Sequence, residues 1–272
     1  MTQTEKAQSF RALHHQAGAF IIPNPWDIGT ARLLAHLGFE ALATTSAGFA
    51  ASLGRRDYNV NRDEVIAHIT TISAATPLPV SADLENGFGD EPESAAETIS
   101  LAAAAGAVGG SIEDSTREAS QPIYEFAHAV DRVRAASETA RALSFPFTLT
   151  ARCENYLVGR TDIKDTIKRL QAYQEAGADV LYAPGLATRE DIVAVVSSVD
   201  RPVNVLAGLP GMDWSREELA AMGVKRISIG SGLARAAFSA FFRAASEMHQ
   251  QGTFTFAQDT MFLSEIGKMF PE

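Results

Sequence analysis

Two short acidic clusters in this chain each follow an apolar run. They are Asp83-Leu84-Glu85 and Ile112-Glu113-Asp114. An acidic side chain has no packing reason to end a buried strand, and carboxylates from two neighbouring strands could together hold a hard divalent cation. Alternatively, these acids only begin the next loop or cap the next helix. The place of the two runs in the fold decides between these interpretations.

Apolar runs recur along the chain and predict the strands that would position these acids. Seven of these runs start with a glycine or a proline, and the two residue types alternate from one run to the next. An earlier run of the same kind begins at Phe20. Short continuous apolar runs of this kind are typical of strands buried on both faces of a parallel sheet. The eight predicted strands begin at or just after Phe20, Gly38, Pro79, Gly106, Pro146, Gly177, Pro202 and Gly223.

The segments between these runs have helical periodicity and helical start signals. Asn61 with Glu64 fits a capping box, as does Ser215 with Glu218. Three further start signals are Pro92 in a first helical turn and Thr161 and Thr188 as N-caps.

Eight strand–helix units in 272 residues predict an α/β fold, with the (β/α)8 TIM barrel as the leading interpretation. A doubly wound open sheet is the alternative, but no G-x-G-x-x-G turn follows the first strand. We expect a single barrel domain over residues 1–272, with residues 253–272 as a C-terminal helical extension. That extension could pack on a neighbouring subunit or on its own barrel.

Composition and charge exclude several classes of protein. The formal net charge is −10 and no basic stripe is present, so nucleic acid is not an expected partner. The longest apolar stretch, residues 99–112, is too short to cross a bilayer, and the first residues lack the pattern of a signal peptide. The single cysteine, Cys153, excludes an intramolecular disulfide and a multi-cysteine zinc site. We therefore expect a cytoplasmic protein with no membrane partner.

The carboxyl ends of the strands are where a parallel barrel carries its active site. This predicted rim is polar, mostly acidic, and has one arginine, Arg152, at its centre. Such a set suits a magnesium ion holding a small oxyanion, with Arg152 forking onto a carboxylate. Alternatively, Arg152 could form an ion pair with Glu113 or Glu154 that only holds the side chains of the rim in place. The rim residues are Asn24, residues 44–48, Asp83, Glu85, Glu113, Asp114, Arg152, Glu154, Tyr182, Asn204, Ser228 and Gly230.

Missing residue types exclude other chemistries. No lysine ends a predicted strand, which argues against a Schiff-base aldolase or a pyridoxal enzyme. No histidine pair has zinc spacing, and no G-x-S-x-G elbow is present. Strand alternation turns Cys153 away from Arg152, which favours a buried structural thiol. Glycines at positions 208, 211, 230 and 232 leave a phosphate-binding barrel open, although tight turns would use the same residues.

Five strings together resemble the phosphoenolpyruvate mutase/isocitrate lyase superfamily. They are TTSAGFAASLGRRD, SADLENGFGD, SIED, TARCENYLVGRTD and ISIGSGLARAA. The resemblance runs from about Phe20 to Ala237. It implies a magnesium-dependent barrel that acts on small 2-oxo or 2-hydroxy carboxylates. It also implies a homo-oligomer, a dimer or more usually a tetramer, that often exchanges its C-terminal helix between subunits.

By motif match, the resemblance also assigns roles to single residues. The metal ligands would be Asp83, Glu85 and Glu113, holding Mg2+ or, in its place, Mn2+. The catalytic residues would be Asp57, Arg152 and Glu113. The substrate contacts would be Ser46, Ala47, Gly48, Arg152 and Asn204. Glu85 stands where many members have an aspartate, and its longer arm would shift the metal or add a water.

The loop after the fourth strand departs from the superfamily pattern. The lyases carry Lys-Lys-Cys-Gly-His there, whereas residues 115–123 read STREASQPI, without Cys, Lys or His. The lysine and asparagine of the mutase and phosphonopyruvate hydrolase loops are absent too. We therefore expect an enzyme that decarboxylates an oxaloacetate-like 2-oxo acid through a metal-stabilised enolate.

Three alternatives to this expectation remain open. The first is a mutase or hydrolase that acts on a phosphorus–carbon bond. The second is a phosphate-binding barrel of another class. The third is a non-catalytic binder of 2-oxo acids.

Overall fold

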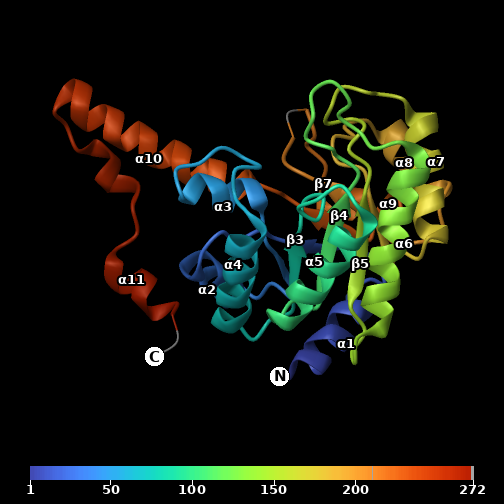
Figure 1. Cartoon of the computed structure of the whole chain (residues 1–272). Coiled ribbons are helices and arrows are strands. Elements are labelled where there is room, and N and C mark those ends of the chain that lie inside the picture. Colours follow the sequence, from blue (N-terminus) through green and yellow to red (C-terminus); the bar gives the residue numbers. More distant parts are fainter. Residues whose placement is uncertain (210, 271–272) are drawn as a thin grey trace.

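The computed structural model describes residues 1–209 and 211–270 and shows a barrel of parallel strands surrounded by helices (Figure 1). Within these residues eight strands form one sheet in the order β1-β8-β7-β6-β5-β4-β3-β2. The strands are β1 (Phe20–Ile22), β2 (Leu42–Ala43), β3 (Val80–Asp83), β4 (Gly109–Glu113), β5 (Thr148–Arg152), β6 (Val180–Tyr182), β7 (Val203–Leu206) and β8 (Arg226–Ser228).

The two ends of the sheet come together. The backbone N–H of Ala43 in β2 donates to the carbonyl oxygen of Pro23, just after β1, at 3.0 Å. Each of the eight apolar runs contains one of these strands. The predicted (β/α)8 barrel is confirmed.

Helices connect successive strands and cover the outside of the barrel (Figure 1). Two additional helices are α1 (Gln3–Leu13), before the first strand, and α3 (Ser46–Ser52), directly after β2. The connecting helices are α2 (Ile28–His36), α4 (Arg62–Ala75), α5 (Pro92–Ala104), α6 (Phe126–Ala142), α7 (Ile163–Glu175), α8 (Arg189–Ser197) and α9 (Arg216–Ala221).

Most of the predicted helix starts are confirmed. Asn61 and Ser215 form capping boxes, Thr188 caps α8, and Pro92 opens α5. The predicted cap at Thr161 is wrong by one residue. The carboxylate of Asp162 caps α7 instead, because it accepts two backbone N–H groups of the first turn.

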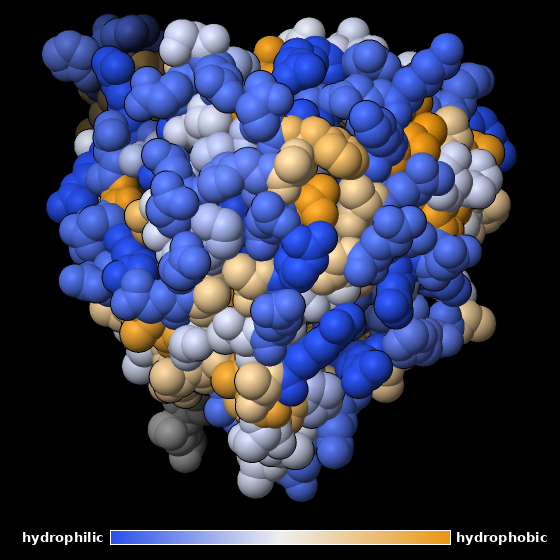
Figure 2. Space-filling model, turned by 45° about the vertical axis from the view of Figure 1, so that its right-hand side comes forward, coloured by the Kyte–Doolittle hydropathy of each residue, from blue (hydrophilic) through white to orange (hydrophobic). Residues whose placement is uncertain are grey.

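The apolar core lies mainly between the barrel and its helices. Leu84, Ile112 and Leu149 belong to this layer and are almost fully buried. By contrast, Ser81 and Ser111 line a cavity inside the barrel. The outer face turned forward in Figure 2 is mostly hydrophilic, with small apolar patches between hydrophilic residues. Within the described residues, no helix combines the length and apolar character that a membrane span requires.

The C-terminal part of the chain leaves the barrel. Helix α10 (Gly232–Gln251) projects outward from the barrel, the chain then turns back, and the short helices η1 (Thr255–Asp259) and α11 (Leu263–Lys268) lie apart from the barrel on the same side (Figure 1). Phe241 and Phe242 of α10 are 73% and 72% exposed, and Phe262 is 76% exposed. Of the two alternatives left open for this extension, its own barrel or a neighbouring subunit, the described residues do not show packing of these aromatic side chains on the barrel. The exposed apolar side chains begin inside α10, earlier than residue 253, and residues 271–272 lie outside the described residues.

Candidate active site

Asp83, at the end of β3, links three elements at the rim of the barrel. Its Oδ2 accepts the backbone N–H of Ser46 at 2.9 Å and the hydroxyl of Ser46 at 2.8 Å. Its Oδ1 pairs with Nη1 of Arg152 at 3.0 Å, and its backbone N–H donates to Thr44 Oγ1 at 2.8 Å. The side chain expected to be the principal metal ligand thus joins the start of α3 to the end of β5.

Arg152 is the centre of an acidic cluster. Its Nη2 lies 3.1 Å from Glu113 Oε2 and 2.9 Å from Glu154 Oε1, in addition to its contact with Asp83. The sequence left open whether Arg152 binds a substrate or pairs with Glu113 or Glu154. The structure shows the ion pairs, with both glutamates at once. Its role in substrate binding stays a prediction.

Burial makes these acids reluctant to ionise. Burial raises the pKa of Glu113 and of Glu154, while the nearby Arg152 opposes that rise. Burial likewise raises the pKa of Glu85 to about 7. For Asp57, partial desolvation and then the charge of Asp83 raise the pKa. A hard divalent cation would relieve this accumulation of negative charge, so the chemistry of the donor set fits Mg2+ or Mn2+.

The predicted metal ligands nevertheless each have another partner. Asp83 contacts Ser46 and Arg152, Glu113 contacts Arg152, and Glu85 pairs with the guanidinium of Arg117. Among residues 1–209 and 211–270, no three His, Cys, Asp or Glu side chains are grouped as a metal-binding set. The assignment of Asp83, Glu85 and Glu113 as metal ligands therefore stays a prediction.

Arg117 and Tyr58 complete the rim and were not found from the sequence. Arg117 lies in the loop of residues 115–123, which a bridge between Ser115 and Ile123 closes. Its guanidinium pairs with Glu85 and lies 5.0 Å from the centroid of the Tyr58 ring. The hydroxyl of Tyr58 donates to Glu113 Oε1 at 3.1 Å. The only sequence signals were that Arg117 is the sole cation of its loop and that Tyr58 follows Asp57.

Backbone strain is concentrated at the same place. Within the described part of the chain, the non-glycine residues with positive φ are Tyr58, Glu85, Phe88 and Arg117, with values between 51° and 66°. Arg117 contacts the other three, since its guanidinium also lies 5.4 Å from the centroid of the Phe88 ring. Strained non-glycine residues often cluster at functional sites because the surrounding structure must hold them in place.

In the predicted substrate loop, residues 46–48, the polar groups of Ser46 and Gly48 form hydrogen bonds with other residues of the protein. The N–H and hydroxyl of Ser46 both serve Asp83, and the N–H of Gly48 donates to Thr45 Oγ1 at 3.2 Å. A Cβ at Gly48 would lie 2.6 Å from Thr45 Cγ2, so packing already requires glycine there. Ala47 is half-buried beside them. Asp57 lies near enough to Ser46 and Asp83 for both to affect its pKa.

Asp114 faces away from the rim. Its carboxylate accepts the hydroxyl of Tyr173 at 2.6 Å and the backbone N–H of Glu154 at 2.8 Å, and it pairs with Arg169 at 3.3 Å. Of the four acids in the two clusters, this one ties β4 to α7. Cys153 is fully buried, as predicted for a structural thiol.

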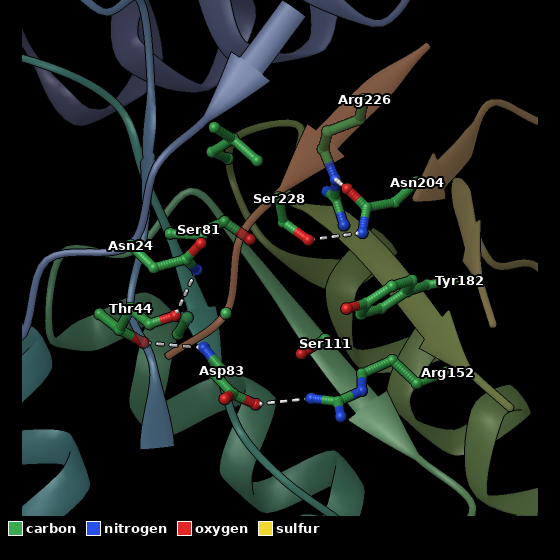
Figure 3. Close-up of a pocket in the computed structure, with 14 residues that line it drawn as sticks. Asn24, Thr44, Ser81, Asp83, Ser111, Arg152, Tyr182, Asn204, Arg226 and Ser228 are labelled. Atoms are coloured by element: carbon green, nitrogen blue, oxygen red, sulfur yellow. Dashed lines mark hydrogen bonds and ion pairs between the residues drawn. The ribbon is translucent and has the colours of Figure 1, made fainter. Parts of the chain in front are cut away.

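Asn204 lies inside the barrel, beneath the rim (Figure 3). Its amide nitrogen donates to Ser228 Oγ at 2.9 Å, and its Oδ1 accepts from Arg226 Nε at 2.9 Å. It borders a cavity of about 60 Å³ that Asp83 and Arg152 also line. The predicted contact between Asn204 and a substrate stays a prediction.

A parallel eight-stranded barrel with a polar, charged rim at the carboxyl ends of its strands is a frame typical of enzymes. The family model for phosphoenolpyruvate phosphomutase matches residues 10–249. The chain therefore belongs to the phosphoenolpyruvate mutase/isocitrate lyase superfamily, as its motifs indicated.

Three similar proteins illustrate the range of this superfamily. A crystal structure from Burkholderia cenocepacia J2315, provisionally named a lyase/mutase, is 61% identical and has a TM-score of 0.97, over 99% of this chain and 97% of that one. A probable 2-methylisocitrate lyase of Corynebacterium glutamicum is 30% identical over 74% of this chain and 66% of its own length. An oxaloacetate decarboxylase of Chromohalobacter salexigens is 27% identical over 90% of this chain and 86% of its own length.

Proposed function

We propose that this protein is an enzyme dependent on Mg2+ or Mn2+ that breaks a carbon–carbon bond of a small, oxaloacetate-like 2-oxo acid. The observation that carries this proposal is the excess of acids at the rim. Five acidic side chains, Asp57, Asp83, Glu85, Glu113 and Glu154, lie around two arginines, Arg117 and Arg152. Burial of most of these groups makes the excess negative charge costly unless a cation joins them.

The residues would divide the work as follows. Asp83, Glu85 and Glu113 would hold the divalent cation, which supplies an electron sink for the enolate formed when the bond breaks. Arg152 would hold one end of the substrate, since its guanidinium can fork onto a carboxylate. The hydroxyl of Tyr58 donates to Glu113 and keeps that carboxylate aimed at the rim.

Ser46, Ala47 and Gly48 would contact the oxygen of the developing enolate at the start of α3. Asp57 would lie beside the reacting group, next to Ser46. Asn204, below the rim, would make a weaker contact with the substrate. These roles follow the motif match and the placement of each residue at or under the rim.

Decarboxylation is favoured over other carbon–carbon cleavages because the loop of residues 115–123 has no Cys, Lys or His to act as a general acid or base. Loss of carbon dioxide needs an electron sink more than it needs such a group. The similarity to an oxaloacetate decarboxylase over most of both chains supports the same choice. Cleavage of a phosphorus–carbon bond is the competing activity, since the family model that matches is named for a phosphomutase.

The exposed apolar side chains of α10 support a homo-oligomer. Leaving Phe238, Phe241 and Phe242 in water is unfavourable, and a second copy of the chain would cover them. We propose a dimer or a tetramer in which this helix packs on a neighbouring subunit.

The decisive experiment compares Asp83→Ala with Glu93→Ala, an exposed acid on α5, over a panel of 2-oxo acids with and without a chelator. Oxaloacetate turnover that needs the divalent cation and is lost in Asp83→Ala alone supports the proposal. Turnover that persists in chelator contradicts the metal requirement. Turnover of phosphonopyruvate alone supports the competing activity, and tight oxalate binding without any turnover indicates a non-catalytic binder.

A further inference from the structure

Three arginines meet at the end of the barrel opposite the rim. Arg11 belongs to α1, Arg141 belongs to α6, and Arg201 precedes β7, so they come from distant parts of the sequence. In Figure 1, α1 lies at the lower end of the barrel, beneath the strands. The three side chains line a cleft with a volume of about 430 Å³. A volume in this range is typical of a site for a small ligand.

The arginines bring more positive charge to this cleft than the protein neutralises. Among residues 1–209 and 211–270, the only acid that lines the cleft is Asp179. Burial raises the pKa of Asp179, whereas the backbone N–H of Leu149 and then the nearby charges of all three arginines lower it. Three guanidinium groups around one carboxylate leave two positive charges without a counter-ion. The charge of the cleft therefore favours an anion, although the protein as a whole carries a net charge of −10.

Two of the charged side chains in the cleft are held in place by the fold. A Cβ at Gly177 would lie 2.6 Å from Nη2 of Arg141, so the guanidinium packs directly on the backbone of the turn before β6. Gly177 has a φ of 100° or more, as such a turn requires, and its carbonyl oxygen accepts the hydroxyl of Ser137 at 3.1 Å. Oδ2 of Asp179 accepts the backbone N–H of Leu149 at 2.9 Å. An arginine that is already positioned loses less conformational freedom when it binds an anion.

A second, smaller cavity adjoins the cleft, shares three of its lining residues, and has a volume of about 40 Å³. It is lined by His14 and Thr148, which are each 3% exposed. In the part of the chain that the structure describes, His14 Nε2 and Thr148 Oγ1 have no hydrogen-bond partner. Nδ1 of His14 donates to the carbonyl oxygen of Phe10 at 2.9 Å, which leaves Nε2 as an acceptor. A space of this size and polarity holds a hydroxyl group or a water.

We propose that this cleft binds the phosphate group of a small phosphomonoester whose hydroxyl groups reach the adjoining cavity. The two positive charges without a counter-ion match a phosphomonoester, which carries a charge of about −1.5 to −2 at neutral pH. Arginine suits this task because its planar donors can fork onto two phosphate oxygens. Leu143 and Phe145, which also line the cleft, offer apolar surface to the carbon skeleton of the ligand. The site lies at the opposite end of the barrel from the rim and does not depend on the proposed function.

The test uses calorimetry in the presence of a chelator, which keeps divalent cations out of the rim. The ligands are ribose 5-phosphate, glycerol 3-phosphate and adenosine 5′-monophosphate, with ribose and inorganic phosphate as counterparts that each carry one half of the recognised chemistry. The variants are Arg141→Gln, Arg201→Gln and Thr148→Val. Arg189→Gln is the matched control, since Arg189 is an exposed arginine of α8 outside the cleft. Thermal unfolding confirms that each variant is folded, and Arg11→Gln serves as a further variant should Arg141→Gln not fold.

At least one of the three esters should bind, and ribose should not. Arg141→Gln and Arg201→Gln should each weaken binding of the ester by about fivefold to tenfold, because each removes a charge-assisted hydrogen bond at a partly exposed site. Arg189→Gln should change it by less than about twofold. Thr148→Val should weaken binding of the ester by about threefold and leave the binding of inorganic phosphate unchanged, because only the ester brings a hydroxyl group.

Three results would overturn the proposal. The first is that none of the three esters binds. The second is an equal loss of binding in Arg189→Gln and Arg201→Gln, because the overall charge of the protein, and not the cleft, would then attract the phosphate. The third is inorganic phosphate that binds as tightly as the esters, which would exclude an organic ligand. None of these measurements uses a 2-oxo acid, so failure of the proposed function would leave them unchanged.

Discussion

Replacing Arg152 by glutamine should destabilise the protein by a predictable amount. The guanidinium lies 3.0 Å from Asp83, 3.1 Å from Glu113 and 2.9 Å from Glu154, and both glutamate side chains are almost fully buried. Removing one partner of a buried ion pair typically costs about 3–5 kcal/mol, because a charge is left uncompensated. At this chain length the melting temperature should fall by roughly 10 °C.

Two changes should restore part of the stability lost when Glu113 and Glu154 have no arginine to pair with. Glu154→Gln in the Arg152→Gln background removes one of them and should restore about half of the lost stability, or roughly 2 kcal/mol. Lower pH should also help. Burial already raises the pKa of Glu113 and Glu154, and loss of Arg152 raises both further. A group with a raised folded pKa stabilises the fold when protonated and loses that contribution as pH rises, so the deficit of the variant should shrink on acidification.

Thermal unfolding in chelator at pH 8 and pH 5 measures these effects. Arg216→Gln is the matched control, since Arg216 pairs with Glu217 on an exposed surface where an ion pair contributes little. The reasoning is refuted if Arg152→Gln unfolds at the same temperature as Arg216→Gln. It is also refuted if the added Glu154→Gln lowers stability further.

Three other perturbations follow from described contacts. Burial lowers the pKa of His14 to about 3, so the stability that depends on its neutral form is present above pH 6.5 and is lost as pH falls towards 3. His14→Phe should remove roughly 5 kcal/mol of that acid sensitivity in denaturant titrations, and an unchanged pH profile would contradict this origin. Phe241→Ser with Phe242→Ser should shift sedimentation towards a smaller species, whereas an unchanged coefficient would exclude this face from the interface. Arg117→Ala frees Glu85 from its ion pair and should tighten Mn2+ binding by about tenfold in calorimetry; weaker binding would mean that Arg117 supports the metal site.

The strands could be predicted because the residues that mark where each one starts are close to it in the sequence. A glycine or proline at the start of each run and continuous apolar residues within it need no knowledge of the rest of the fold. Thr161 was chosen over Asp162 because two adjacent residues both suit an N-cap, and only the geometry of the first turn separates them.

The contacts of Arg117 could not be predicted. They depend on how the loop of residues 115–123 folds back over residues 58, 85 and 88, which are distant in sequence. The direction of α10 could not be predicted from the sequence for another reason. An amphipathic helix has the same periodicity whether its apolar face meets its own barrel or another molecule.

Asp114 could have been assigned from the sequence. Side chains alternate along a strand, so the residue after the rim acid Glu113 must face the helices. The same rule correctly turned Cys153 away from Arg152. Applied to both strands, it separates the acids of the rim from the acid that packs against α7.

Because Leu84, Ile112 and Leu149 pack outward against the helices, the shell of the molecule supplies most of its apolar stabilisation. The axis of the barrel carries serines and an asparagine that contribute little of it. Substitutions along that axis can therefore alter which molecules are accepted while leaving the scaffold intact. A laboratory search for new specificities should begin with positions 81, 111 and 228 and leave the outward layer unchanged.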